Sequence, residues 1–415
     1  MDAAPHPSNT PVASLALRDL WRYPWMRHAL TLWVILAIAS AVKCYVQPWE
    51  HSVYPNFYKA TIRWWNDDSI YTLTGYQYTP TFAIANSPFA WCGISAGAAL
   101  FNAASIAALV AAVFVLARDV LPGRWTLAGA ALLLTLTFAG ALRGVWASQS
   151  NALVIALVIF AASAILRQRW WTASFLLAAP VFVKLWPMAL VMLVLACWPS
   201  KLWWRFPLAC LALAAVPFLT RWPETVLFQH QQYWIALTHL QTIRSGGYRD
   251  AWTILEQFVE PSRRAYLLLQ LGGALAVLGF CLWRRWRAPS PRHAMTAVLS
   301  AWIVWQLLLG PGSERMTYGI IAPLAGWAVV VSFQQGRGRL LSFTAWSFTS
   351  VLGTGAVERI LAPYVGGVEA IQPIGVVLFA AWLLANELRG ARQVEQPATE
   401  TPPVEQPLPA TRMAA

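Results

Sequence analysis

Apolar residues along this chain gather in long runs, and polar residues gather in a few connections between them. Most runs approach the length of a helix that crosses a ~30 Å hydrocarbon core at ~1.5 Å per residue. They cover residues 29–46, 93–117, 127–142, 152–166, 172–183, 185–198, 206–219, 265–283, 294–309, 317–333, 340–352 and 371–388. Because backbone groups in lipid must bond within their own segment, the runs predict an all-α polytopic membrane protein.

The same pattern predicts one transmembrane domain over residues 27–390 with about 10–13 transmembrane helices. A cytoplasmic segment, 1–26, precedes it. A disordered tail rich in Pro, Glu, Thr and Gln, 391–415, follows it. Four polar connections are expected on the outer side, at about 47–78, 220–264, 310–316 and 353–370.

Composition agrees with a membrane protein. The chain of 415 residues is 58% hydrophobic and 11% charged, with a mean hydropathy of +0.51, which excludes a soluble domain. Its net charge of +13 comes from basic residues scattered between the apolar runs, so we expect topology signals and no nucleic-acid partner. The five cysteines lack metal-ligand spacing and predict neither a disulfide framework nor a zinc site.

The basic residues predict an orientation through the positive-inside rule. Arg18, Arg22 and Arg27 precede the first run and would hold the N-terminus in the cytoplasm. Alternation then places these further clusters inside: Arg118/Arg124, Arg167/Arg169, Lys201/Arg205, Arg284/Arg285/Arg287, Arg337/Arg339 and Arg389/Arg392. The assignment holds only if residues 171–198 cross the membrane and return.

Residues 171–198 are interrupted by Lys184 and Pro187. A charged ammonium inside an apolar run is costly, and such a break between short helices can bring it to a polar cavity. A hairpin puts Lys184 near the outer surface, beside the long polar connections. One interpretation is a phosphate-binding lysine, and the other is a lysine that extends to the interface from a hairpin tip.

The first outer connection, 47–78, combines charged residues with many aromatic ones, including Tyr58 and Tyr78. Such aromatics can stack on sugar rings, but they also suit a belt at the membrane interface. In the second connection, Val226, Leu227, Tyr233, Trp234, Leu237 and Leu240 recur at helical spacing. They predict an amphipathic helix on the membrane surface, which either forms a wall of the site with Trp234, Tyr248 and Asp250 or is a plain interfacial helix.

Several short motifs follow in a characteristic order. They are YPNFYKA (54–60), WWNDDSIY (64–71), YQYTPTFAIANSPFA (76–90), SQSN (148–151), KLWP (184–187) and GPGSERMTY (310–318). Together they resemble glycosyltransferase family 87, whose members are polyprenyl-phosphate-sugar-dependent enzymes of the GT-C superfamily. SQSN is similar to the family's Gly-Gln-x-Asn element, and KLWP matches its Lys-x-x-Pro.

The resemblance implies a GT-C-like bundle in the inner membrane of a bacterial cell envelope, with its site facing the periplasm or exterior. It implies an inverting hexosyltransferase that moves a sugar, with mannose suggested by family analogy, from a polyprenyl-phosphate donor to a glycan or lipid acceptor. Membrane lipids are the other expected partners. No nucleotide cofactor is expected, because a lipid-phosphate donor needs no nucleotide-binding loop. A metal is not predicted, because His230 and His239 are too far apart for a helical pair of ligands, although carboxylates could hold one.

The motifs suggest roles for individual residues. Lys184, Arg143 and Arg315 are candidates to bind the donor phosphate, because cationic groups stabilise the charge that grows on a leaving phosphate. Either arginine could instead pair with a carboxylate or a lipid headgroup. The expected substrate-binding residues are Asn56, Tyr58, Tyr78, Gln149, Asn151, Trp234, Tyr248, Asp250 and Tyr318.

The general base is where the chain departs from the family pattern. Asn56, before Phe57, stands where family members commonly carry an Asp, and an amide cannot remove a proton. Glu314 is one alternative base, although it could instead cap a helix or pair with Arg315. Asp67 and Asp68 are others, although they could form a solvated turn.

Two other functional classes fit the same hydropathy. A transporter or flippase of lipid-linked sugars would also use a broken helix and an outer cavity. A catalytically inactive relative that binds lipid-linked sugars is suggested by Asn56. The polar chemistry is concentrated in the outer connections, which favours an enzyme with an outward-facing site.

Overall fold

The computed structural model describes residues 23–72, 76–242, 247–364 and 366–395, and in this part of the chain all the regular elements are helices. The prediction of an all-α polytopic membrane protein is confirmed. Six helical stretches are long and apolar enough to cross a membrane, and a bent pair, Arg339–Leu352 with Gly355–Leu361, would make a seventh. The larger count of 10–13 spans and the GT-C-like arrangement stay predictions.

The six stretches are α1 (Pro24–Val46), α5 with η5 (Ile94–Val120), α6 (Leu127–Trp146), α10 to η6 (Pro199–Leu219), α14 (Arg263–Arg287) and η9 with the start of α19 (Val368–Leu388). Three shorter apolar helices are α7 (Asn151–Leu166), α8 (Trp170–Val183) and α9 (Met188–Cys197). Also present are α15 (Pro291–Leu308), η7 (Arg315–Ile320), α16 (Ala322–Gln335), α17 (Arg339–Ser347) and η8 (Phe348–Leu352).

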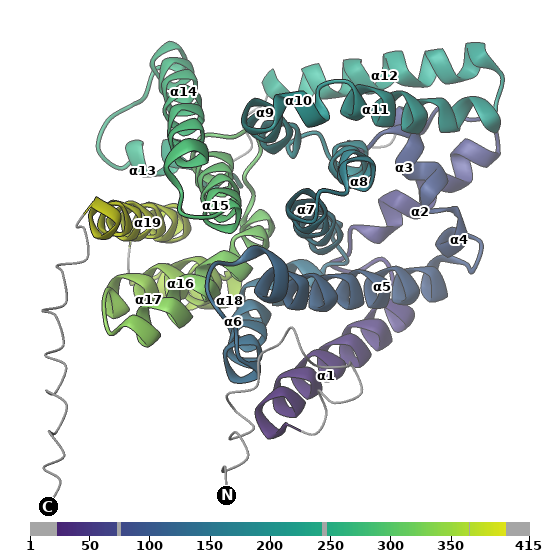
Figure 1. Cartoon of the computed structure of the whole chain (residues 1–415). Helices are drawn as coiled ribbons and strands as arrows, with labels where there is room; N and C mark the ends of the chain where they lie inside the picture. The colour runs from purple at the N-terminus through teal and green to yellow at the C-terminus, as the bar shows by residue number, and fades with distance from the viewer. Residues whose placement is uncertain (1–22, 73–75, 243–246, 365, 396–415) are drawn as a thin grey trace, which may run out of the picture.

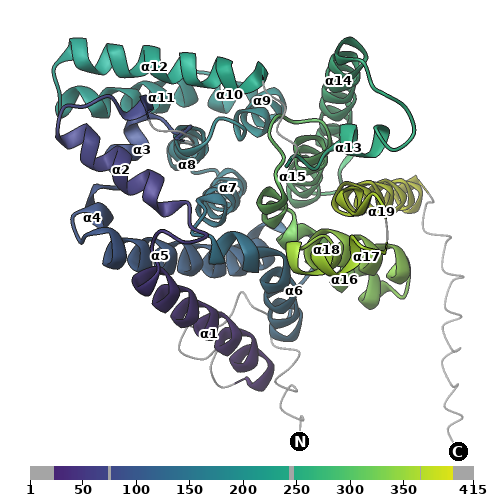
Figure 2. The same ribbon diagram turned by 180° about the vertical axis from the view of Figure 1, so that it is seen from behind.

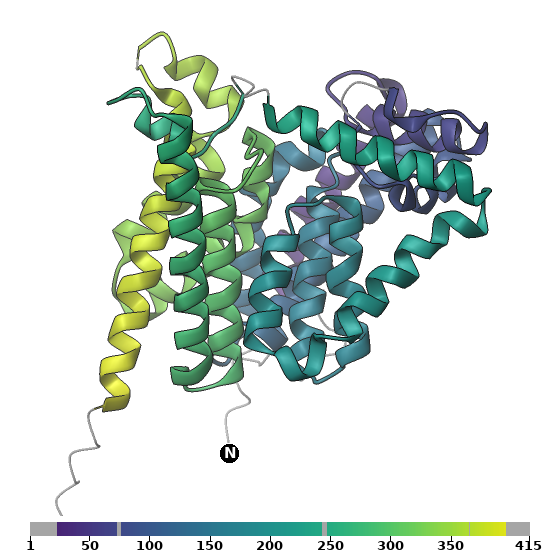
Figure 3. The same cartoon turned by 90° about the horizontal axis from the view of Figure 1, so that it is seen from above.

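Helices from the predicted outer connections, together with α3 and α4 just after the first connection, complete the fold. They are α2 (Tyr54–Trp65), η4 (Ile70–Thr72), α3 (Pro80–Ala85), α4 (Ser87–Ala90), α12 (Pro223–Thr242), α13 (Ala251–Leu255) and α18 (Gly355–Leu361). Figures 1 and 2 show α13 to α19 on one side of the molecule and α2 to α5 with α11 (Arg205–Ala215) and α12 on the other. In Figure 3, α14, α15 and α19 stand upright while α12 crosses the upper end of the neighbouring helices.

The break at Lys184 separates two antiparallel helices. Pro187 lacks an N–H group and disfavours a helical Trp186, so α8 ends at Val183 and α9 begins at Met188. The rings of Trp171, at the start of α8, and Trp204, after α9, are 5.1 Å apart. Both therefore lie at the same end, so this stretch forms a hairpin, and its predicted crossing of the membrane and back stays a prediction.

The predicted inner clusters gather at the end of the molecule that holds Trp171. Arg167 pairs with Asp119 at 2.7 Å, Arg285 donates to the Cys197 carbonyl, and Arg284 pairs with Glu387 at 2.5 Å. We call this the basic end, which lies at the bottom of Figure 3, and the opposite end, which holds Lys184, the site end. That the basic end faces the cytoplasm stays a prediction.

Packing divides the apolar residues into two cores. The larger core runs through the upright helices, from Met26 in α1 to Leu383 in α19. A second core lies at the site end and contains Tyr54, Phe57, Trp64, Tyr76 and Tyr78. Most aromatics of the first outer connection thus pack on one another. The sequence suggested instead that they form an interfacial belt or a surface that stacks on sugars. Trp49, which is 55% exposed, is an exception.

The ends of the chain differ slightly from the predicted boundaries. The helix α19 continues to Glu395, a few residues into the stretch that we predicted as a disordered tail. Most of the predicted N-terminal segment, and the tail from residue 396, lie outside the described residues.

Candidate functional site

Lys184 is held by a chain of amide side chains. Its Nζ donates to Asn151 Oδ1 at 2.8 Å, and Asn151 Nδ2 donates to Gln149 Oε1 at 2.6 Å and to the Met316 carbonyl at 3.1 Å. The Asn151 amide is therefore occupied on both sides. Lys184, Asn151 and Gln149, which belong to two separate sequence motifs, lie together in the structure, and their predicted roles in phosphate and substrate binding stay predictions.

The ammonium of Lys184 lies deep in the protein, although part of its side chain reaches solvent. Nζ is 5.7 Å from the centre of the Tyr78 ring, a cation–π contact that suits a partly desolvated cation. Burial lowers the pKa of Lys184 to about 8, while the charge of Glu314 opposes that shift. The lysine is thus not simply extended into water from a hairpin tip.

Glu314 faces this lysine from the turn that precedes η7. Residues Tyr248 and Glu314 form an antiparallel bridge, and the Arg249 N–H donates to the Ser313 carbonyl at 2.7 Å. The Glu314 side chain is exposed and makes no capping hydrogen bond to η7. Arg315 pairs with Glu358 at 2.5 Å. The structural roles considered for Glu314, a cap or a partner of Arg315, are therefore not what the structure shows.

A cluster of arginines lies next to η7. Glu358 on α18 pairs with Arg249 at 3.1 Å as well as with Arg315. Arg143 lies close enough to these three residues for their charges to act on its guanidinium. A Cβ at Gly355 would overlap Arg143 Nη1 and lie 2.8 Å from Arg315 Nη1. Both guanidinium groups therefore lie against the backbone at Gly355, and the cluster carries excess positive charge.

Arg315 is only partly neutralised in this cluster. Its Nε is buried and has no hydrogen-bond partner within the part of the chain that the structure describes. Burial lowers the pKa of its guanidinium, and Glu358 acts in the opposite direction. A charge-assisted donor of this kind is suited to an anionic ligand, because a guanidinium presents several N–H groups in a fixed plane.

Asp250 and Tyr318 make contacts within the fold. Asp250 caps α13 by accepting from the Thr253 N–H at 3.2 Å, and both partners are buried. The hydroxyl of Tyr318 donates to the Arg249 carbonyl at 2.8 Å. These contacts attach the segment around Tyr248 to η7. Asp250 and Tyr318, both predicted to bind substrate, therefore hold the backbone around the site in place.

Asn56 and Tyr58 lie in the first turns of α2, where both side chains are partly exposed. The Val53 N–H donates to the Ala147 carbonyl at 2.9 Å. This bond attaches the start of α2 beside the turn that carries Gln149 and Asn151. Asn56 thus belongs to an element that adjoins the lysine site.

Asp67 and Asp68 lie at the other end of α2, and both are exposed. Asp67 is 3.7 Å from Arg221, and the Asp68 carbonyl accepts from Gln229 Nε2 at 3.1 Å. These contacts are to α12 and the segment before it. Of the three predicted bases, Glu314 is the one whose charge acts on Lys184 among the described residues.

The predicted wall residue Trp234 lies on α12 and is 59% exposed. Its neighbour Tyr233 is buried and contacts Tyr71, from which ring contacts continue through Tyr76 to Tyr78 beside Lys184. The predicted helix is present, but its apolar face is narrower than expected. Val226 and Tyr233 are buried, whereas Leu227 and Trp234 are exposed.

Sequence reasoning missed Arg249, Glu358 and Arg359. Glu358 and Arg359 lie in the outer connection 353–370, which was recognised as polar but not for its charges. Arg249 precedes Asp250, which was singled out. Among the described residues, no group of three or more His, Cys, Asp or Glu side chains could hold a metal ion.

The model of glycosyltransferase family 87 matches residues 76–311. This range contains Tyr78, Arg143, Gln149, Asn151 and Lys184, and it ends before Glu314. Asn56 also lies outside it. Comparison with curated proteins gives no significant match.

Proposed function

The chain belongs to glycosyltransferase family 87, and from this membership we propose that it transfers a sugar from a polyprenyl-phosphate donor to a hydroxyl of a glycan or lipid acceptor. The reaction takes place at the site end, around Lys184, and this end faces the periplasm or exterior. The sugar is a hexose, with mannose the first candidate by family analogy.

The observation that carries the proposal is the held ammonium of Lys184. Asn151 fixes it through a 2.8 Å hydrogen bond, and Asn151 is itself fixed by Gln149 and the Met316 carbonyl. A cation that is already positioned requires little reorganisation when charge develops nearby, which is the source of electrostatic catalysis. A lysine that served only solubility would not need this support.

In the proposed reaction, the acceptor oxygen forms a bond to the anomeric carbon as the bond from that carbon to the phosphate oxygen breaks. The bonding electrons leave with the polyprenyl phosphate, which gains negative charge. Lys184 stabilises that charge. The acceptor's proton passes to a general base, and attack opposite the leaving phosphate inverts the anomeric configuration.

We assign the base role to Glu314. Its side chain is exposed, it lies in the turn before η7, and its charge acts on both Lys184 and Tyr78. Asn56, on the adjoining α2, can hydrogen-bond an acceptor hydroxyl but cannot take its proton. Asp67 and Asp68 are weaker candidates, because their contacts are at the far end of α2.

Arg143 and Arg315 are assigned to the donor phosphate before and during transfer. Both lie against Gly355, and Arg315 retains a buried N–H without a partner among the described residues. Glu358 neutralises part of the cluster, which keeps the arginines in place without cancelling their excess charge.

The experiment is transfer of radiolabelled mannose from synthetic polyprenyl-phosphate mannose to a membrane-extract acceptor by the purified protein. We expect Lys184→Ala and Glu314→Gln to lower transfer by about 100-fold or more, the usual range for such groups. Lys201→Ala and Glu260→Gln, which change exposed residues of the same types, should leave transfer unchanged. Asp68→Asn should also have little effect.

A second candidate function rests on Asn56 alone, namely binding of a lipid-linked sugar without transfer. The same assay separates the two. If no donor sugar supports transfer by the wild type while Asn56→Asp produces it, the chain is an inactive relative. If neither protein transfers any sugar, the enzymatic proposal is wrong.

A further inference from the structure

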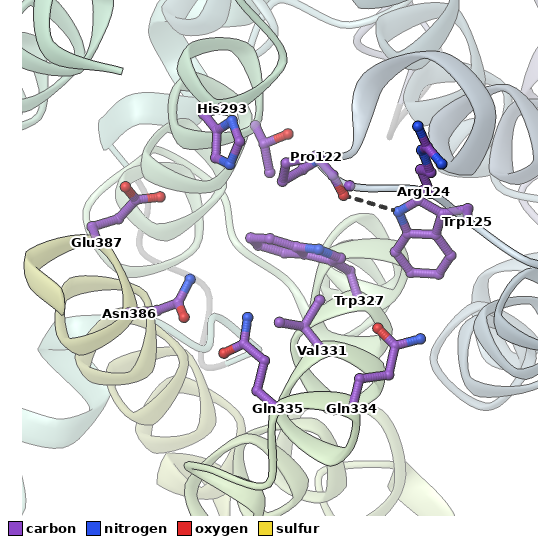
Figure 4. A pocket seen from close by; sticks show the side chains of 12 residues that line it. Pro122, Arg124, Trp125, His293, Trp327, Val331, Gln334, Gln335, Asn386 and Glu387 are labelled. Carbon is purple, nitrogen blue, oxygen red and sulfur yellow. Dashed lines mark hydrogen bonds between the residues drawn. The ribbon is translucent and has the colours of Figure 1, made fainter. Parts of the chain in front are cut away.

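A cavity at the basic end has no part in the proposed transfer. It has a volume of about 250 Å³ and lies among the segment before α6, the start of α15, the end of α16 and the end of α19 (Figure 4). Its lining includes the polar side chains of Arg124, His293, Thr296, Gln334, Gln335, Asn386 and Glu387. Most of these side chains can donate hydrogen bonds.

Trp327 supplies the first sign that a ligand belongs there. Its side chain is only 2% exposed and extends across the middle of the cavity in Figure 4. Its Nε1 has no acceptor among the described residues, whereas Trp125 Nε1, on the cavity's edge, donates to the Pro122 carbonyl at 3.2 Å. A buried N–H is usually paired, so an acceptor from a ligand would complete the site.

Charge gives the second indication. The one carboxylate of the lining, Glu387, is already engaged by Arg284 at 2.5 Å, and both side chains are almost fully buried. Arg124 is exposed at the rim of the cavity. Arg284, which does not itself line the cavity, neutralises Glu387, so Arg124 is the charged group of the lining that has no ion pair among the described residues. The other polar groups of the lining are amides, a hydroxyl, an imidazole and indole N–H groups. The cavity favours an anion with several acceptor oxygens.

We propose that this cavity binds a phosphate-bearing ligand, namely the headgroup of an anionic membrane lipid. Its lining comes from α15, α16, α19 and the segment before α6 at the basic end, which the predicted orientation places near the lipid headgroups. Basic pockets between spanning helices are suited to such headgroups. Gln334, Gln335 and Asn386 would contact the headgroup's hydroxyls, and Arg124 and Trp327 its phosphate.

The test titrates the full chain, purified in a non-ionic detergent, with phosphatidylglycerol and counts bound lipid by native mass spectrometry. We expect one retained lipid per chain, with an affinity about tenfold lower in Arg124→Gln and in Trp327→Phe. Trp327→Phe removes the N–H while keeping the aromatic ring, and Arg124 is exposed, so neither change should unfold the protein. Arg169→Gln, an exposed arginine at the same end, is the matched control.

Two further ligands distinguish the sources of the phosphate. Inorganic phosphate that displaces the lipid in the wild type, but not in Arg124→Gln, would support the phosphate chemistry and assign it to a soluble ligand. Equal retention of neutral phosphatidylcholine would overturn the proposal. So would equal loss of affinity in Arg169→Gln, because the effect would then reflect general surface charge. Sugar transfer is measured in parallel and should be unchanged, since the proposal does not rest on it.

Discussion

Lys184 illustrates how a residue proposed to act in a functional site can also lower the stability of the folded protein. Its pKa is lowered to about 8 by burial, so the folded state binds its proton less tightly than the unfolded chain does. Such a lysine destabilises the fold below about pH 8, and the penalty diminishes as pH rises toward the ordinary value of 10.5. A cost retained in this way is typical of a functional cation.

This yields a prediction with two opposite pH dependences. Sugar transfer should fall as pH rises through about 8, because the ammonium that stabilises the leaving phosphate is lost. Over the same range, the wild type should gain thermal stability relative to Lys184→Met. The measurement compares initial rates and melting curves between pH 7 and 10.5 for both proteins. A constant stability difference would contradict the lowered pKa.

Among residues of the site end, we expect substitution of Glu358 to lower the stability of the fold most. It pairs with Arg249 and Arg315, and the Arg249 side chain is only 6% exposed. Glu358→Gln would leave both guanidinium groups without their counter-charge, and we expect a loss of about 2 kcal/mol in stability, below the full cost of breaking a fully buried pair.

Thermal unfolding in detergent measures the effect of Glu358→Gln. Glu369→Gln, which changes a second carboxylate on the same connection, is the control and should have a smaller effect because Glu369 has no ion pair among the described contacts. Equal destabilisation by the two changes would show that the pairing at Glu358 is unimportant.

At the scale of elements, the sequence predicted those features that depend on local pattern. The α8–α9 hairpin followed from an apolar run interrupted by Lys184 and Pro187, and the placement of Arg167 and Arg284 at one common end followed from alternation along the chain. Each of these signals lies within one segment or its flanks.

The features that sequence reasoning missed depend on contacts between distant segments. Arg249 and Glu358 pair across 109 positions, and nothing near either residue indicates the other. From sequence alone, the aromatic residues of α2 could equally lie in an interfacial belt or on a sugar-stacking surface. Their burial around Phe57 is decided by the approach of Phe82 and Phe101 from other helices.

The start of α18 gives a prediction for an element that brings two cations together. In Gly355→Ala the added Cβ would overlap Arg143 Nη1 and crowd Arg315, so both guanidinium groups must move. We expect a KM for the donor raised by about fivefold or more, with a smaller change in kcat, if the arginines bind the donor phosphate.

Gly366→Ala is the matched control for this substitution, because a Cβ at Gly366 would meet no atom within 4 Å. Alanine also favours helix over glycine at position 355, so a loss of donor affinity could not be attributed to helix propensity. An unchanged KM in Gly355→Ala would remove Arg143 and Arg315 from the donor site.

At the scale of the whole molecule, the two ends have different chemistry. The basic end collects arginines from several helix termini, whereas the site end holds the aromatic core, Lys184 and Glu314. The positive-inside rule assigns the basic end to the cytoplasm. The proposed reaction requires the same orientation, because the polyprenyl-phosphate donor is to be used on the outer face.

Cys92 allows this orientation to be tested directly. It is exposed and lies at the site end, between α4 and α5, whereas Cys44, Cys197 and Cys281 are buried. A membrane-impermeant maleimide added to intact cells, with access through any outer membrane, should therefore label the wild type and fail to label Cys92→Ser. In the Cys92→Ser background, Arg169→Cys should react only after the inner membrane is opened, because position 169 is exposed at the basic end. The reverse pattern would place Lys184 and Glu314 in the cytoplasm and contradict both the topology and the outward-facing transfer, even if the purified protein were active.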